Sequence, residues 1–341
     1  MTIAQRTGAF AKLGAFLNRH YAGRQIPEET QLHKGLEALI PVVQQHNPWF
    51  TPESVNGALQ NIASMLEPSG LENFTKDLKD SEARQVAVIC AGNIPLVCFH
   101  DVLCVLLSGH RILIKMSADD NLLLPFFLKL LVHYEPEFEH AIRFADGKLS
   151  GFEAVIATGS NNTAKHFEYY FRSYPHIIRR NRTSVAVIRG DESEAELREL
   201  GKDIFMYFGL GCRNVGKILV PQEYDFGLLF QSLHVYGNVI QHNKYANNYE
   251  YHRSLYLLES IPFLDNNFLI LRESTELHSP VSVLFYQRFK DEVEVNAYLN
   301  TNRDQIQCIV GREFTPFGCS QRPVITEFAD KVDTMEFLVH L

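Results

Sequence analysis

Cys212 is the residue whose neighbours best suit nucleophilic chemistry. It lies in the segment Tyr207–Asn214, behind Gly209 and Gly211 and directly before Arg213. Glycine has no Cβ, so a substrate carbonyl can approach the thiol closely. A neighbouring cation favours the thiolate, which is the reactive form of cysteine. The segment therefore predicts a cysteine nucleophile that attacks a carbonyl carbon.

Asn93 is a second candidate for the same chemistry. It follows the short apolar run Val86–Cys90 and precedes a helix-length apolar segment, Ile94–Leu107. An amide at the end of a strand can donate its N–H to the oxyanion that forms when a carbonyl is attacked. Asparagine is also a favoured helix cap, so the pattern leaves both roles open.

Four further polar or small residues lie where cofactors commonly bind. They are Lys115, Gly159, Ser160 and Glu276. Lys115 ends the apolar run Ile112–Ile114, and open α/β sheets bind ligands outside the carboxyl ends of their strands. Gly159 and Ser160 stand between a strand and a helix, where backbone N–H groups bind anions. Glu276 can accept hydrogen bonds from ribose hydroxyls. A solvated lysine, a simple N-cap turn and a surface carboxylate are the alternative interpretations.

Alternating apolar runs and helix-length segments predict the architecture. Strands are expected at 86–90, 112–114, 152–156, 185–188, 218–220, 282–289 and 306–310, and helices at 94–107, 121–134, 163–172, 194–205, 226–236 and 292–299. This alternation indicates parallel βαβ units. We expect an N-terminal helical segment at 1–80, a nucleotide-binding α/β domain at 81–183, a catalytic α/β domain at 184–314 that carries Cys212, and a C-terminal tail at 315–341 that has little regular structure and packs back on the domains.

Composition and missing motifs exclude several classes of protein. The chain has 32 basic and 40 acidic side chains, a net charge of −8, which argues against a nucleic-acid binder. No secretory leader and no unbroken membrane span are evident, so we expect a cytoplasmic protein. The six cysteines form no CxxC pair and the histidines lack metal spacing, so no metal is expected. Asn214 replaces the third glycine of a dinucleotide fingerprint.

Together these residues resemble the aldehyde dehydrogenase superfamily, and most of all its acyl-CoA reductase branch, the LuxC family of fatty-acid reductases. The similarity runs from about Ala83 to the C-terminus, and segment 208–214 is its most specific part. The resemblance implies an aldehyde-dehydrogenase-like α/β fold with a Rossmann-type cofactor domain and an α/β catalytic domain. It also implies roles for single residues: nucleophile (Cys212), oxyanion amide (Asn93), adenosine-ribose site (Lys115, Ser117), turn near the cofactor diphosphate (Gly159, Ser160) and nicotinamide-ribose carboxylate (Glu276).

One departure from the superfamily bears on the reaction. Hydrolytic aldehyde dehydrogenases carry a glutamate that activates water for deacylation, but the corresponding stretch here, Ile178–Ser184, contains no carboxylate. An enzyme that releases a carboxylic acid needs such a base, whereas acyl exchange with a thiol does not. The arginines at 179, 180 and 182 contact phosphates of CoA or cofactor, or form a solvated basic loop; the sequence leaves both open.

The resemblance therefore implies an NADPH-dependent reductase, with NADH as the other candidate cofactor, that converts a fatty acyl thioester to the aldehyde. The donor is acyl-CoA or an acyl-protein thioester, and an acyl-activating protein is a candidate partner. A homo-oligomer is expected by analogy with the superfamily. Two alternatives remain: an aldehyde dehydrogenase that forms acid, and a partner-dependent acyl-transfer subunit.

Overall fold

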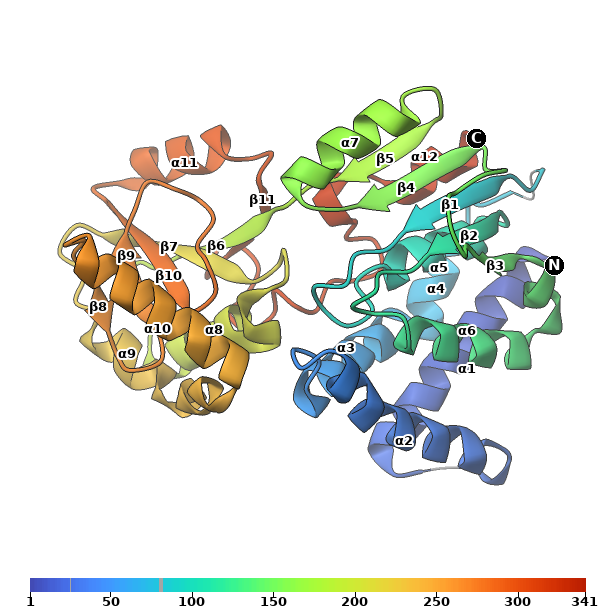
Figure 1. Ribbon diagram of the computed structural model, residues 1–341, viewed down its shortest axis with the longest axis horizontal. Helices are drawn as coiled ribbons and strands as arrows, with labels where there is room; N and C mark the ends of the chain where they lie inside the picture. Colours follow the sequence, from blue (N-terminus) through green and yellow to red (C-terminus); the bar gives the residue numbers. More distant parts are fainter. Residues whose placement is uncertain (25, 80–81) are drawn as a thin grey trace. The chain divides into compact units, whose positions relative to one another are not determined.

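The computed structural model describes residues 1–24, 26–79 and 82–341, and the chain forms two compact units (Figure 1). Unit 1 comprises Met1–Asn181 together with Pro323–Leu341, and unit 2 comprises Arg182–Arg322. The N-terminal helices and the first sheet thus belong to one unit. The four-part domain division stays a prediction.

Unit 1 contains a five-stranded parallel sheet with the order β3-β2-β1-β4-β5. Its strands are β1 (Gln85–Ile89), β2 (Arg111–Lys115), β3 (Ile142–Phe144), β4 (Ala154–Thr158) and β5 (His176–Arg179). Alternate residues of β1 face opposite layers: Val86 and Val88 join the large core, whereas Ala87 packs with Phe167 and Phe171 of α7 (Asn161–Phe171). Burial on both faces explains why these strands are continuous apolar runs in the sequence.

On the other side of this sheet, helices form the large core. They are α1 (Ile3–Ala22), α2 (Thr30–His46), α3 (Pro52–Met65), α4 (Pro68–Thr75), α5 (Phe99–Leu107) and α6 (Leu123–Tyr134). Of these, α5 lies directly against β1 and β2. The Thr51 hydroxyl caps α3 by accepting a hydrogen bond from Ser54 N, with Pro52 in the first turn. Pro68 is the first residue of α4, because proline suits the start of a helix.

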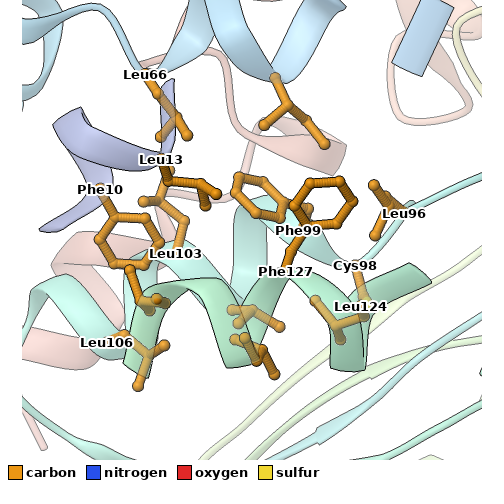
Figure 2. Close-up of a cluster of buried hydrophobic side chains, with 14 of the residues drawn as sticks. Phe10, Leu13, Leu66, Leu96, Cys98, Phe99, Leu103, Leu106, Leu124 and Phe127 are labelled. Carbon is orange, nitrogen blue, oxygen red and sulfur yellow. The ribbon is translucent and has the colours of Figure 1, made fainter. Parts of the chain in front are cut away.

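Figure 2 shows how these helices meet in the core. Side chains of α1, α5 and α6 interdigitate, and Leu96 and Cys98 reach the same cluster from the loop that precedes α5. The predicted helix 94–107 is therefore wrong at its start: α5 begins at Phe99, and Leu96 has a left-handed backbone with φ of 57°. Apolar composition continued through the loop because its side chains are buried, and this burial concealed the turn.

The C-terminal segment packs back onto unit 1. The His110 ring contacts Leu338 O at 2.9 Å, and Arg179 donates to Ala329 O and to Thr334 Oγ1. The expectation of little regular structure there is wrong at α12 (Thr334–Val339), whose N-cap is Asp333.

Arg179 is not part of a solvated or phosphate-binding loop. Its side chain is buried and forms two hydrogen bonds to the Asp101 carboxylate, of 2.6 and 3.1 Å. Burial alone would lower the pKa of Arg179, but the Asp101 charge raises it. Both interpretations of this arginine from the sequence are thus wrong, because the sequence does not reveal that β5 carries it to α5.

Unit 2 contains a six-stranded sheet with the order β11-β6-β7-β10-β9-β8. Its strands are β6 (Thr183–Val187), β7 (Val215–Pro221), β8 (Leu264–Asp265), β9 (Ile270–Glu273), β10 (Val283–Phe289) and β11 (Ile306–Val310), and only the β8–β9 pair is antiparallel. Helices α8 (Glu194–Phe205) and α9 (Gly227–Leu233) contribute to one core cluster, α11 (Glu292–Thr301) to another, and α10 (Asn243–Leu258) to a third. The sequence did not predict α10, β8 or β9.

Candidate active site

Cys212 lies in a tight turn between a short 3₁₀ helix, Met206–Gly209, and β7. Its side chain is half-buried. Before the turn, Tyr207, Phe208 and Gly209 all have left-handed backbones, with φ of 53°, 57° and 79°. Residues other than glycine rarely adopt this backbone conformation, and each one that does costs about 1–3 kcal/mol. Strain of this kind persists only where surrounding contacts impose it.

Asn214 imposes it. Its buried amide oxygen accepts a hydrogen bond from Gly211 N at 2.8 Å, and its Nδ2 donates to Asp203 O at 3.0 Å and to Met206 O at 2.7 Å. One side chain therefore joins the end of α8, the strained segment and the turn. The residue that breaks the dinucleotide fingerprint is the residue that holds the cysteine turn.

One more contact fixes the backbone of the cysteine itself, and others hold the elements around the turn. Ser184 Oγ donates to Cys212 O and accepts from Cys308 N, both at 3.2 Å. The fully buried Asp203 carboxylate accepts from Gly318 N and Ser320 N, and burial raises its pKa. The Cys212 carbonyl is thus tied to β6 and, through Ser184, to β11, while Asp203 ties α8 to the segment 318–320.

Glu276 belongs to the same unit as Cys212. It lies in the connection 274–282, which links β9 to its parallel neighbour β10. This connection comes back toward the start of β7: a Cβ on Gly216 would lie 3.1 Å from Ser279 Oγ. The Glu276 side chain is exposed, while Leu277 is buried against Leu219 in the core. The geometry leaves the Glu276 carboxylate open to a ligand.

The segments that carry Asn93, Lys115 and Ser117 are adjacent in unit 1. Cys90 N donates to Lys115 O at 2.9 Å, and a Cβ on Gly92 would lie 2.5 Å from Ser117 Oγ. The loop after β1 and the loop after β2 are therefore in contact, and only glycine fits at position 92. The N-cap of α5 is Cys98, so the capping alternative for Asn93 at this helix is wrong.

The loop after β2 is held from two directions. Its Ala118 carbonyl contacts the His46 ring at 2.7 Å, and its Asp119 carbonyl accepts from Asn47 Nδ2 at 3.2 Å, both at the end of α2. On its other side, Asp120 accepts a hydrogen bond from Leu96 N at 2.8 Å. Asp120 is buried, and burial raises its pKa to about 6.

Gly159 and Ser160 lie between β4 and α7, also in unit 1. Ser160 is the N-cap of α7, since its Oγ accepts from Thr163 N at 3.2 Å. A Cβ on Gly159 would lie 3.0 Å from Thr163 Cβ and 3.2 Å from the Phe167 ring. The simple N-cap interpretation is confirmed. The first N–H groups of α7 still lack intrahelical acceptors, as in any helix, and suit an anion.

Sequence reasoning missed the residues that hold these loops. They are Asp120, Asp203, Asn214 and Lys217, and all four are buried polar or charged side chains. Lys217 offers the clearest signal in retrospect, because it interrupts the apolar run of β7, where a parallel strand buried on both faces should carry no charge.

The fold is that of the aldehyde dehydrogenases. The chain superposes on aldehyde dehydrogenase 21 from Physcomitrella patens, solved with the product succinate (TM-score 0.68, 11% identity, 100% of this chain and 84% of that one). It is also similar to the NAD⁺ complex of an aldehyde dehydrogenase from Bacillus cereus (0.62, 14%, 91% and 72%) and to an aldehyde dehydrogenase from Pseudomonas aeruginosa (0.65, 12%, 91% and 72%). No curated protein sequence matches the chain.

The family comparison is more specific than the fold comparison. The model of the acyl-CoA reductase (LuxC) family matches residues 11–224, and the chain belongs to this family. It is accordingly an oxidoreductase that acts on aldehyde or acyl groups. The matched range includes Asn93 and Cys212 but not Glu276.

Neither a metal-binding cluster nor a membrane-spanning helix occurs among the described residues. Within the ranges given above, no three histidine, cysteine, aspartate or glutamate side chains form a group that could hold a metal ion. Over the same ranges, no helix combines the length and apolarity needed to cross a membrane.

Proposed function

We propose that this protein reduces a fatty acyl-CoA to the aldehyde with NADPH, through a thioester on Cys212. The observation that carries the proposal is the Cys212 turn, in which Asn214 and Ser184 hold a half-buried thiol on a strained backbone. Family membership supports acyl-CoA as the donor. A cytoplasmic location is carried over as a proposal from the sequence. A homo-oligomer and an acyl-activating partner are carried over as proposals from the resemblance.

In the first half-reaction the Cys212 thiolate adds to the carbonyl carbon of the acyl thioester. The carbon–sulfur bond to CoA breaks and CoA leaves as a thiolate, so that the acyl group is held as a Cys212 thioester. The Asn93 amide and the Cys212 backbone N–H donate to the oxyanion, as the family resemblance implies. One such donor contributes about 3 kcal/mol to the transition state.

In the second half-reaction the Cys212 thioester is reduced to a thiohemiacetal, which collapses to the aldehyde and regenerates the thiolate. When bound, NADPH supplies the hydride. The chain has residues suited to hold it: Lys115 and Ser117 for the adenosine ribose, the α7 start at Gly159 and Ser160 for the diphosphate, and Glu276 for the nicotinamide ribose. Gly92 packs against Ser117 and Gly159 packs against Thr163, which fixes the backbones of the two loops that carry these residues.

Deacylation by water is disfavoured in this proposal. The stretch Ile178–Ser184 carries no carboxylate, and Arg179 within it is engaged by Asp101. Without a neighbouring general base to activate water, the thioester reacts with hydride or with a thiol instead. We therefore place aldehyde formation above oxidation of aldehyde to acid.

Product analysis tests the proposal. The purified chain is mixed with a long-chain acyl-CoA and NADPH, and free CoA, aldehyde (trapped as its hydrazone) and fatty acid are quantified. Equal amounts of CoA and aldehyde are expected. Steady production of acid from aldehyde and NADP⁺ would favour the dehydrogenase alternative. Aldehyde formed only after addition of an acyl-activating protein would favour the partner-dependent subunit.

A further inference from the structure

Lys217 is a fully buried ammonium in the middle of β7. Strand alternation places it on the same face of the sheet as Leu219, which packs with α11 residues in the core. The ring of Tyr298 in α11 covers it, with Nζ 4.7 Å from the ring centroid. Burial lowers the pKa of Lys217 to about 8. A charged group at an apolar position is costly, so its contacts call for an explanation.

All three of its N–H donors have acceptors. Nζ donates to Ser274 O at 2.8 Å, to Glu276 O at 2.9 Å and to Gln287 Oε1 at 2.9 Å. Two of these acceptors are backbone carbonyls of the connection 274–282. Gln287 lies on β10, the strand between β7 and β9. The ammonium therefore bridges the sheet and the segment that carries Glu276.

The connection needs such a bridge because of its topology. Parallel neighbours such as β9 and β10 require a crossover that returns along one face of the sheet, usually through a helix. Residues 274–282 contain no helix or strand, so few of their carbonyls have acceptor roles in regular structure. Lys217 satisfies two of these carbonyls, and one of them belongs to Glu276 itself.

We propose that Lys217 is a positioning residue that fixes the Glu276 carboxylate for binding of the nicotinamide ribose. This inference rests on the proposed function for the role of Glu276, but not for the bridge. Lys217 contacts neither the cysteine turn nor any residue of the first half-reaction among its described contacts. It should therefore act on cofactor binding and on the reductive step, and leave acylation of Cys212 unchanged.

The test compares Lys217→Met, Lys217→Arg and a matched control, Tyr298→Phe. Methionine keeps most of the aliphatic stem and removes all three donors. Arginine keeps the charge and donors with a different placement. Tyr298 is packed on the same ammonium, and its hydroxyl has no hydrogen-bond partner among the described residues, so its loss should cost little.

We expect cofactor binding, the acylation rate and hydrogen exchange to respond differently to these substitutions. Lys217→Met raises the dissociation constant and KM for NADPH about tenfold or more, while the rate of Cys212 acylation without cofactor stays within about twofold of wild type. Lys217→Arg is intermediate, and Tyr298→Phe matches wild type. Hydrogen exchange of the apo protein shows faster exchange at 274–280 in Lys217→Met. A folded Lys217→Met with wild-type NADPH binding and wild-type exchange would overturn the proposal.

Two further outcomes are also decisive. If Lys217→Met does not fold, Lys217→Arg carries the test, and wild-type NADPH affinity together with wild-type exchange in that variant overturns the proposal. If the wild-type protein itself binds no nicotinamide cofactor, the proposed function fails, and with it the role of Glu276. Exchange in the apo variants still decides whether Lys217 holds the connection.

Discussion

At the scale of single residues, the candidate nucleophile is positioned by hydrogen bonds to the backbone of its turn. Asn214 and Ser184 hold the Cys212 turn through hydrogen bonds to main-chain atoms. A rigid backbone places both the thiol and the adjacent N–H, and rigid placement of donors is what stabilises a developing oxyanion. The sequence predicted Cys212 from glycines and a cation, but gave no indication that asparagine would organise the turn.

Asn93→Ala tests the oxyanion role at this scale. The substitution removes one N–H donor, so single-turnover acylation of Cys212 should slow about 100-fold. The dissociation constant for NADPH should not change. Rapid-quench measurement of the acyl-enzyme and fluorescence titration of the cofactor check the two expectations. Asn121→Ala, at an exposed asparagine of the same unit, is the matched control. Unchanged acylation in Asn93→Ala would remove the residue from the mechanism.

At the scale of elements, the loop after β1 is positioned by a buried carboxylate. Asp120 accepts from Leu96 N at 2.8 Å, and Leu96 has a left-handed backbone three residues after Asn93. Leu96 is also buried in the core beside Cys98 (Figure 2). The hydrogen bond and the packing together hold a conformation that leucine alone disfavours.

Asp120→Asn tests this arrangement through the pH dependence of stability. The pKa of Asp120 is raised to about 6 from 3.8, so between these values the folded protein binds more protons than the unfolded chain. Wild-type stability therefore falls as pH rises from about 4 to about 6, by up to roughly 3 kcal/mol, and the loss is complete above pH 6. The Asp120→Asn variant has no carboxyl group at this position, so its free energy of unfolding lacks this pH dependence.

Urea unfolding of both proteins at pH 4, 5, 6 and 7.5 measures the effect. The free energy of unfolding of Asp120→Asn minus that of wild type should increase through this range and level off above pH 6. Asp119→Asn is a useful control, because that side chain is exposed. If the difference does not change with pH, the pKa of Asp120 is not raised in the folded protein, and the expectation fails.

Comparison of sequence and structure shows what local patterns can reveal. Apolar runs predicted the parallel strands, because burial on both faces leaves a continuous signature. Helix α8 was predicted with its observed bounds, and the structure shows that Ser193 and Glu196 form a capping box at its start. Buried polar groups such as Lys217 were missed, because their acceptors lie far away in the sequence and only the tertiary fold supplies them.

At the scale of the whole molecule, unit 1 contains residues from both ends of the chain. Arg179 links β5 to α5 through Asp101 and to the C-terminal segment through Ala329 and Thr334. A buried ion pair is compatible with a stable fold only while both partners are present. If one partner is removed, the other remains a buried, uncompensated charge. The integrity of unit 1 thus depends on a residue that the sequence left open as a phosphate contact or part of a solvated loop.

Arg179→Met tests this structural role. The variant should lose about 3–5 kcal/mol of unfolding free energy, because Asp101 is left buried and unpaired. The KM for acyl-CoA should not rise in protein that remains folded. Arg180→Gln is the matched surface control, since Arg180 pairs with Glu168 in an exposed ion pair, and should change stability by less than about 1 kcal/mol. A raised KM for acyl-CoA without loss of stability would restore Arg179 to a phosphate-binding role.

The most direct test of the account is intact-mass spectrometry of the protein mixed with a medium- or long-chain acyl-CoA in the absence of cofactor. We expect one acyl adduct that maps to Cys212, is discharged when NADPH is added, and is absent from a folded Cys212→Ala variant. An adduct at another residue, or a Cys212→Ala variant that still forms aldehyde, would contradict the covalent mechanism.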